Sequence, residues 1–298
     1  MNSRSEKTNR AYRQDLETFR AWLLTEGFPV ESIDDAARLL LSSGQGAANG
    51  LAMKYQTFLR DQGQASSSIN RRISALKSLV RQANLLGMVP WTLTVTRLKV
   101  KAYRDTRGPG LANYRKMLEL TKSRHDPKGV RDYAILSTLY SLALRRSELV
   151  DTRLEDLDLE ANTLAIIGKG DTQRIRLTLP DPTKQALVAW LDVRGIVPGP
   201  LFYGIDKGGN LKGGLTGNGL YHIIKDLGKR IGIETRVHGI RHLACTQAVR
   251  AASAADLDIS TVLQFSRHAS LKTLEIYIDN DRDYQGRISS LVAMGMEG

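Results

Sequence analysis

His238-Gly239-Ile240-Arg241-His242 places two imidazoles and a guanidinium within five residues, at the predicted start of a helix. Further along the chain comes Arg267-His268, and Tyr277 follows that histidine by nine positions. Guanidiniums bind phosphate groups, imidazoles can transfer protons, and a tyrosine hydroxyl can act as a nucleophile. This C-terminal stretch therefore indicates phosphate chemistry.

Two segments upstream carry the same kinds of side chain. Ala143-Leu144-Arg145-Arg146-Ser147-Glu148-Leu149 lies at a predicted junction between helices, and Gly168-Lys169-Gly170 at the tip of a predicted hairpin. Each has an ordinary structural explanation when taken singly, such as an ion pair between Arg145 and Glu148 one helical turn apart. The interpretation therefore depends on all four segments occurring together.

The composition is that of a basic globular protein. The chain has 298 residues, with 43 Lys and Arg against 31 Asp and Glu, and a net charge of +12. Its length predicts about two domains, and its charge predicts binding to a polyanion such as nucleic acid. No apolar run approaches a membrane span, and the N-terminus lacks the apolar segment of a secretory signal, so we expect a cytoplasmic protein without membrane partners. The one cysteine, Cys245, excludes an internal disulfide.

Two common kinds of catalytic motif are absent from the sequence. There is no Gly-rich loop ending in Gly-Lys-Ser/Thr, which argues against ATP use. There is also no cysteine–histidine cluster with metal-ligand spacing. We therefore predict no cofactor and no metal, and any phosphate chemistry must be done by side chains.

Residues 1–103 are predicted to form an all-helical domain. One apolar stripe at helical spacing runs from Tyr12 to Leu23, and a second from Ile69 to Ala83. Ser66-Ser67-Ser68 is the predicted N-cap of the second helix, and Gly87 its stop. Two more helices are predicted, at residues 32–42 and 47–62.

Helix 69–83 carries polar and basic side chains off its apolar stripe. This pattern fits a helix that faces nucleic acid, and equally a solvated helix face. The basic segment that follows ends in Gly108-Pro109-Gly110, which predicts an interdomain linker over 104–110 with a flexible hinge. The predicted DNA-binding residues are Asn70, Arg71, Arg72, Lys77, Lys99, Lys101, Arg104, Arg174 and Arg267.

Residues 111–298 are predicted to form a mostly helical α+β domain. Thr163 to Ile167 and Arg174 to Leu179 flank a Gly-bounded turn, which predicts a β-hairpin. The predicted fold class is thus mainly α, with a small β-sheet in the second domain. Helices are predicted at residues 111–122, 129–143, 182–194, 217–231, 239–252, 257–265 and 271–278.

In order and spacing, the four polar segments resemble the catalytic boxes of the tyrosine recombinases, the phage integrase family. The first box of that family reads Gly-Leu-Arg-x-Ser-Glu-Leu, and Ala143 stands here in place of its glycine. His238, Arg241 and His242 match the second pattern, His-x-x-Arg-His, in full. The final box usually reads Leu-Gly-His with a tyrosine nine residues on, and Arg267 replaces its glycine. The helical N-terminal region also resembles the core-binding, SAM-like domain of the family, so the resemblance covers essentially the whole chain.

The resemblance implies a site-specific recombinase that cuts and rejoins DNA through a 3′-phosphotyrosyl intermediate, without metal or nucleotide. Tyr277 would be the nucleophile. Arg145 and Arg241 would hold the non-bridging oxygens of the transition state, where fixed positive charge stabilises developing negative charge. Lys169 would protonate the departing 5′ oxygen, a role that suits a lysine surrounded by other cations.

The other site residues have supporting roles under the same resemblance. His238 is expected to be the general base or proton shuttle, and His268 to bond a phosphate oxygen. Glu148 is expected to orient the arginines, whereas His242 is expected to be structural or secondary. Arg267 is expected either to alter the local turn or to add a phosphate contact. Tyr284 is a weaker rival nucleophile because it lies outside the expected spacing.

The resemblance also implies the partners. The family acts on double-stranded recombination sites as a homo-tetramer, through a Holliday junction, and the two domains are expected to clamp the duplex as a C shape. The predicted core-binding helices begin almost at residue 7, so no arm-binding domain is expected before them, which favours the Xer or small mobile-element kind. Two alternatives remain open: DNA relaxation of the type IB topoisomerase kind, and a catalytically inactive DNA-binding protein. Target site and accessory proteins also stay open.

Overall fold

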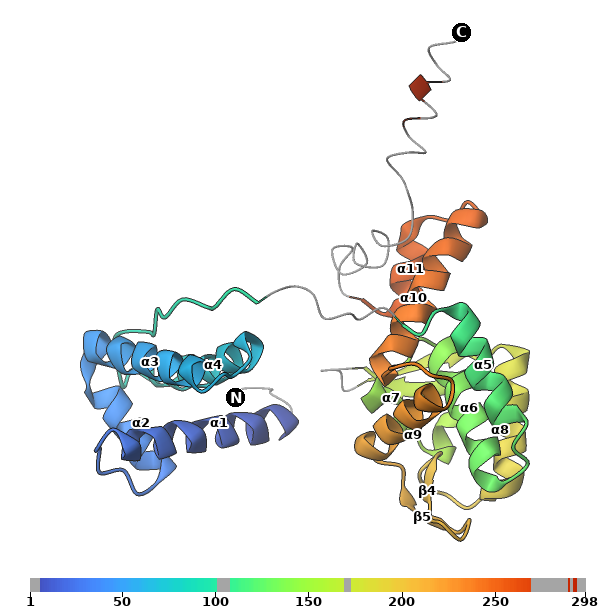
Figure 1. Ribbon diagram of the computed structural model, residues 1–298, viewed down its shortest axis with the longest axis horizontal. Helices are drawn as coiled ribbons and strands as arrows, with labels where there is room; N and C mark the ends of the chain where they lie inside the picture. Colours follow the sequence, from blue (N-terminus) through green and yellow to red (C-terminus); the bar gives the residue numbers. More distant parts are fainter. Residues whose placement is uncertain (1–5, 101–107, 169–172, 269–288, 290–291, 294–298) are drawn as a thin grey trace. The chain divides into compact units, whose positions relative to one another are not determined.

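The computed structural model describes residues 6–100, 108–168, 173–268, 289 and 292–293 (Figure 1). The chain divides into two compact units, Met1–Arg104 and Asp105–Gly298. No helix among the described residues is long and apolar enough to cross a membrane. Outside the described residues lie the predicted helix 271–278 and five of the candidate site residues: Lys101, Arg104, Lys169, Tyr277 and Tyr284.

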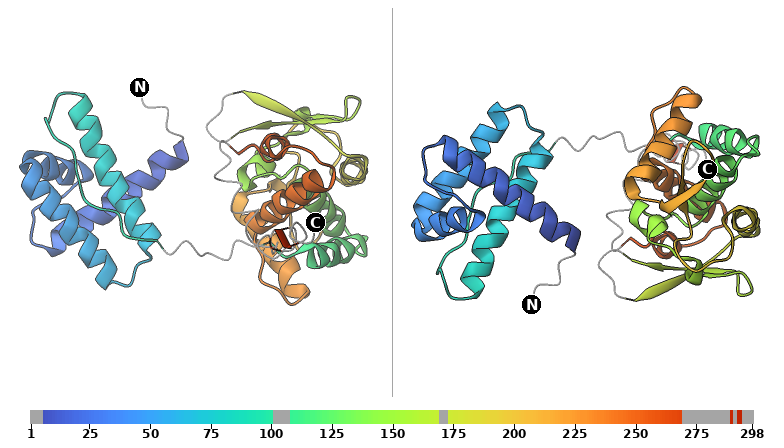
Figure 2. Two further views of the ribbon diagram at one scale, coloured as in Figure 1. Left: turned by 90° about the horizontal axis from the view of Figure 1, so that it is seen from above. Right: turned by 90° about the horizontal axis from the view of Figure 1, so that it is seen from below.

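The first unit is all-helical, as predicted. Its helices are α1 (Glu6–Thr25), α2 (Ile33–Ser42), α3 (Gly44–Asp61) and α4 (Ser66–Leu85). α4 crosses α1 and packs against it (Figure 2). The apolar stripes of all four helices meet in one core, whose large members include Phe19, Trp22, Leu23, Tyr55 and Ile69.

The ends of these helices follow local side-chain chemistry. Ser32 and Asp35 form a capping box at the start of α2, in which each side chain accepts a hydrogen bond from the backbone N–H of the other. The prediction that the serines at 66–68 cap α4 is wrong, because Ala65 is the N-cap and the serines form the first turn. The predicted stop is confirmed, since Gly87 adopts the left-handed φ of 72° that commonly follows a helix end.

An extended segment, residues 91–100, follows α4 and lies along α3 and α4. Its inward side chains Leu93 and Val95 are buried in the core of the first unit. Its backbone is held at every second residue by an amide side chain from a helix. The pairs are Thr94 N to Asn49 Oδ1 (2.8 Å), Gln56 Nε2 to Thr96 O (3.0 Å), and Leu98 with Asn70 in both directions (2.9 Å each).

The second unit is mostly helical with small antiparallel sheets, again as predicted. Its helices are α5 (Leu111–Lys122), α6 (Pro127–Ser141), α7 (Arg146–Val150), α8 (Asp181–Arg194), α9 (Gly217–Arg230), α10 (Val237–Ala254) and α11 (Ile259–Ser266). A short 3-10 turn, η1, spans Leu154–Asp156.

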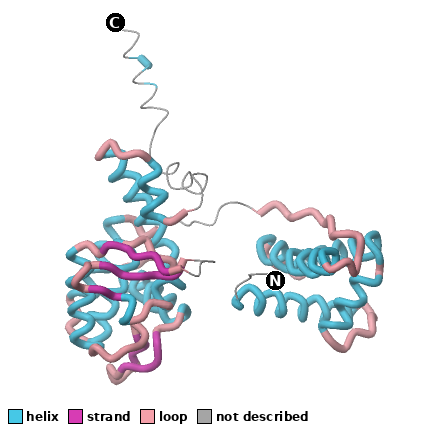
Figure 3. The backbone as a smooth tube through the Cα atoms, turned by 180° about the vertical axis from the view of Figure 1, so that it is seen from behind, coloured by secondary structure: helices cyan, strands magenta, loops and turns pink. Residues whose placement is uncertain are grey.

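Three strands form the main sheet of this unit (Figure 3). β1 (Leu157–Asp158), β2 (Thr163–Ile167) and β3 (Arg174–Thr178) are antiparallel in that order, which confirms the predicted hairpin. A second hairpin, β4 (Tyr203–Ile205) with β5 (Leu211–Gly214), was not predicted. Its sequence is rich in glycine and therefore lacks the apolar alternation that marks a strand.

α6 is the central helix of the second unit. It is buried along most of its length and packs against α5, α8 and α10. α10 packs in turn against α11. This packing brings together three chain segments: the turn 142–145 after α6, the first turns of α10, and the turn 266–268 after α11.

Candidate active site

Three predicted catalytic side chains come from these three segments and meet. They are Arg145 from the turn after α6, Arg241 from α10 and His268 from the turn after α11. Nη2 of Arg241 lies 3.3 Å from Nε2 of His268. Arg241 is only 2% exposed and also donates to the backbone carbonyls of Ala143 and Ser266, so it joins the turn after α6 to the turn after α11.

Glu148 lies beneath Arg145 and fixes its position. The carboxylate accepts from the backbone N–H of Arg145 at 2.9 Å and from its Nη1 at 2.5 Å. Burial alone would raise the pKa of Glu148, but the hydrogen bonds from Arg145 and the charges of Arg267 and Arg145 outweigh it and lower that pKa. Glu148 is therefore a carboxylate at neutral pH, which matches the orienting role expected of it.

His238 lies on the first turn of α10, at the exposed edge of the same cluster. Desolvation, with the positive charges of Arg241 and Arg145, lowers its pKa. A lowered pKa keeps the imidazole neutral at neutral pH, when it can accept a proton. His242, one residue after Arg241, is buried at 5% exposure with Thr246 Oγ1 3.5 Å from its Nδ1, in keeping with a structural role.

Arg267 points into the protein. It forms an ion pair with Glu148 (3.0 Å), and its guanidinium donates to backbone carbonyls of the turn after α6. Its side chain is 11% exposed. These internal partners favour the first of the two expectations for Arg267, an effect on the local turn, over the phosphate contact. Lys169 and Tyr277 lie outside the described residues, so their roles stay predictions.

Three of the predicted DNA-binding residues in the first unit have partners within that unit. The side-chain amide of Asn70 is engaged at both ends by the backbone of Leu98. Arg71 Nη1 lies 2.5 Å from the buried carboxylate of Asp15, and Arg72 lies 3.8 Å from the same group with 18% of its side chain exposed. Sequence reasoning missed Asp15 as their partner, although an acidic residue close to an apolar stripe of a helix was a usable signal.

The remaining predicted DNA-binding residues vary in exposure. Lys99 is exposed and Lys77 is half-buried. Arg174, at the start of β3, is paired with the buried carboxylate of Asp156 while 47% of its side chain stays exposed. DNA contact by these cations therefore stays a prediction.

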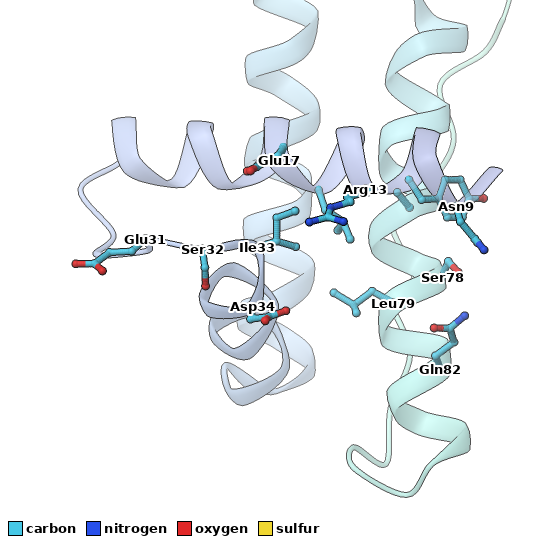
Figure 4. Close-up of a pocket in the computed structure, with 13 residues that line it drawn as sticks. Asn9, Arg13, Glu17, Glu31, Ser32, Ile33, Asp34, Ser78, Leu79 and Gln82 are labelled. Atoms are coloured by element: carbon cyan, nitrogen blue, oxygen red, sulfur yellow. The ribbon is translucent and has the colours of Figure 1, made fainter. Parts of the chain in front are cut away.

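A hollow of about 610 Å³ lies in the first unit between α1, the start of α2 and α4 (Figure 4). Its walls mix polar and apolar groups: Asn9 and Arg13 from α1, Asp34 from α2, and Leu79 and Gln82 from α4. No predicted catalytic residue lines it. The candidate active site is thus the cluster in the second unit and not this hollow.

The sequence matches two family models, and together they cover most of the chain. The model described as "Phage integrase family" matches residues 112–283. This chain belongs to that family, the tyrosine recombinases. The model described as "Phage integrase, N-terminal SAM-like domain" matches residues 1–84, in the first unit of this tyrosine recombinase.

Named relatives support the same conclusion. A tyrosine recombinase of Synechococcus elongatus is 38% identical over 97% of this chain and 90% of its own length. The tyrosine recombinase XerC of Pseudomonas putida is 30% identical over 93% of this chain and 86% of its own. The predicted family and reaction class, a site-specific DNA-cutting and rejoining enzyme, are confirmed, and neither the topoisomerase nor the inactive alternative is favoured.

Solved structures share the fold at lower identity. The Tn1549 transposon integrase in complex with transposon right end DNA superposes with a TM-score of 0.63 and 14% identity, over 92% of this chain and 98% of that one. XerH bound to a palindromic difH substrate has a TM-score of 0.61 and 19% identity, over 81% of this chain and 72% of that one. The predicted fold class is therefore confirmed.

Proposed function

We propose that this tyrosine recombinase activates the scissile phosphate of a DNA site with Arg145, Arg241 and His268. The observation that carries the proposal is the convergence of these side chains from three separate chain segments, with buried Glu148 beneath Arg145. Two guanidiniums can neutralise the non-bridging oxygens of a pentavalent transition state, and held rigidly they do so without reorganising during the reaction.

The proposed reaction moves a phosphoryl group from DNA to Tyr277 and back. The phenolic oxygen forms a bond to phosphorus, and the bond from phosphorus to the 5′ oxygen breaks. His238 accepts the phenolic proton, and Lys169 donates a proton to the 5′ oxygen. The product is a 3′-phosphotyrosyl link with a free 5′ hydroxyl, so the bond energy is retained for rejoining.

The proposed substrate is a double-stranded recombination site, to which both units bind. The net charge of +12 favours this reading, and Lys99 is an exposed cation of the first unit that could contribute. The relatives include a XerC recombinase, and two structural neighbours were solved with DNA, one with transposon right end DNA and one with a palindromic difH substrate. We propose a homo-tetramer acting on two sites through a Holliday junction, in the cytoplasm.

A nicked suicide DNA substrate tests the nucleophile. Release of the short fragment beyond the nick prevents rejoining. The wild type should therefore accumulate a covalent protein–DNA adduct joined through a 3′ phosphate, and the released fragment should carry a free 5′ hydroxyl. Tyr277→Phe should form no adduct, whereas the matched control Tyr284→Phe should form it as the wild type does. An adduct that persists in Tyr277→Phe would overturn the assignment.

The same preparation separates the alternatives. Relaxation of supercoiled plasmid without any specific site would favour a topoisomerase. DNA binding by the wild type with no adduct on any tested site would favour an inactive DNA-binding protein. The tetramer is tested by the mass of the complex formed with two sites in solution.

A further inference from the structure

Two departures from the family boxes, both at glycine positions, fall at left-handed backbone positions. Ala143 and Arg267 stand where the family boxes carry glycine, and they have φ values of 44° and 54°. Only glycine adopts this conformation without cost, whereas other L-residues pay about 1–2 kcal/mol. At both positions the backbone has a conformation that suits glycine and strains the residue present. An interaction that compensates for this strain is therefore expected.

The two departures are bonded to each other. Nη2 of Arg267 donates to the carbonyl of Ala143 at 2.9 Å, and Nη1 donates to the carbonyl of Leu142 at the same distance. Nη1 also reaches the carbonyl of Phe265 at 3.2 Å. A glycine at 267 could make none of these bonds. The guanidinium therefore fastens the turn after α6 to the turn after α11.

Arg267 also shares Glu148 with Arg145. Nη2 of Arg267 donates to Oε2 of Glu148 at 3.0 Å, the oxygen that also accepts from the backbone N–H of Arg145. The side chain of Arg145 completes this network, because its Nη2 donates to the carbonyl of Arg267 at 3.1 Å. Arg145 is thus held on two sides, by Glu148 and by the backbone of Arg267.

These contacts argue that Arg267 does not bind DNA. Both terminal nitrogens of its guanidinium donate to groups of the protein, and its Nε is buried. The side chain is 11% exposed, against 28% for Arg145. Arg267 would have to leave Glu148 and three backbone carbonyls before it could reach a phosphate.

We propose that Arg267 is a positioning residue of this recombinase, which holds Arg145 and the turn bearing His268 in the geometry that binds the scissile phosphate. It acts through Glu148 and through the carbonyls at 142 and 143. The inference rests on the proposed function, in which Arg145 and His268 touch the phosphate. It adds to that function an ion pair and hydrogen bonds that the glycine of the family pattern cannot make.

Arg267→Gly tests the proposal, because it restores the family residue, removes the strain and removes the guanidinium. The readouts are the single-turnover cleavage rate at saturating suicide DNA and the DNA dissociation constant. We expect the rate at saturation to fall by about 10- to 100-fold, since small misplacements of catalytic groups have effects of this order. DNA affinity should stay within about twofold, because no phosphate contact is lost.

Arg267→Lys and a double-mutant cycle complete the test. Lysine keeps the charge and the strained backbone but lacks the planar fork, so it should recover little of the lost rate. If Arg267→Gly fails to fold, the cleavage rate of Arg267→Lys decides instead. Combined with Glu148→Gln, Arg267→Gly should be strongly non-additive, since both changes break one network. Arg230→Gly, at the exposed end of α9, is the control for loss of a cation.

Two outcomes would overturn the proposal. One is a wild-type cleavage rate in both Arg267 variants. The other is weaker DNA binding with a shallower salt dependence and an unchanged rate at saturation, which would make Arg267 a phosphate contact. Failure of the proposed function is distinguishable, because it appears as an adduct in Tyr277→Phe or as no adduct in the wild type.

Discussion

The guanidinium of Arg241 and the imidazole of His268 lie side by side, with Nη2 and Nε2 3.3 Å apart. A guanidinium can only donate, so the imidazole nitrogen accepts and the ring is neutral in the free protein. Burial, with the positive charges of Arg241 and its neighbours, lowers the pKa of His268 to about 4. The pair therefore persists only while His268 is unprotonated.

This pairing predicts acid sensitivity. We expect the free energy of unfolding to fall as the pH drops from about 6.5, the pKa of an unfolded histidine, towards 4. In that window the unfolded chain binds a proton that folded His268 does not, so acid favours unfolding. Urea unfolding at about pH 7 and about pH 5 measures it. His268→Gln should lose less stability between the two values than the wild type or His222→Gln, and equal losses would contradict the prediction.

A second prediction concerns Gly108, the first described residue of the second unit. A Cβ added there would overlap the carbonyl oxygen of Gly239 and lie 2.8 Å from Cβ of Leu243, both on α10. Gly108→Ala must therefore displace the helix start that carries His238 and Arg241. We expect a cleavage rate reduced by about tenfold or more, with a lower melting temperature.

Gly110→Ala is the matched control for Gly108→Ala. Gly110 has a φ of +76°, but an added Cβ meets nothing within 4 Å. Alanine there costs backbone strain of about 1 kcal/mol without moving α10, so the melting temperature should fall while cleavage at saturation is retained. Equal cleavage by the two variants would mean that Gly108 does not position the catalytic helix. The packing of Gly108 also shows that only part of the predicted hinge is free of close contacts.

Those parts of the fold that carry a local signal could be predicted from the sequence. The stripes of α1 and α4, and the Gly-bounded turn between β2 and β3, depend on neighbours a few residues apart. The start of α4 was misplaced because its N-cap is Ala65, whose methyl side chain makes no capping hydrogen bond, so capping chemistry does not mark this helix start. The β4–β5 hairpin was missed because its glycines conceal the strand pattern.

For the candidate site, the sequence predicted the types and order of the residues but not the direction of every side chain. The types of side chain and their order predicted Arg145, Arg241 and His268, and the structure brings them together. The direction of Arg267 could not be predicted, because its partners at 142 and 143 lie far away in the sequence. Asn70 faced the same ambiguity, since a polar residue beside an apolar stripe looks alike whether it faces DNA or an extended segment of its own chain.

A third prediction tests whether Asn70 binds DNA or stabilises the first unit. Asn70→Ala removes the two hydrogen bonds with the backbone of Leu98, so the free energy of unfolding should fall by about 1–3 kcal/mol. Lys99→Ala should leave stability nearly unchanged and reduce the slope of DNA affinity against salt by about one. Urea unfolding and binding titrations over a salt series provide both measurements. A reduced salt slope in Asn70→Ala, with stability unchanged, would instead make Asn70 a DNA contact.

The last prediction concerns Glu148, whose side chain is 1% exposed and bonds both Arg145 and Arg267. Glu148→Gln keeps the size but removes the charge, and it leaves two guanidiniums facing a neutral amide. We expect the free energy of unfolding to fall by about 3 kcal/mol, as when one partner of a buried ion pair is lost, and cleavage at saturating DNA to fall by about tenfold or more. Because the pKa of Glu148 is lowered, the stability that it contributes is present above about pH 4.5 and is lost as the pH falls further.

Glu155→Gln, at an exposed glutamate paired with Arg153, is the control for Glu148→Gln. It should change neither the free energy of unfolding nor the cleavage rate appreciably. Wild-type cleavage by Glu148→Gln would show that Arg145 is held without this carboxylate.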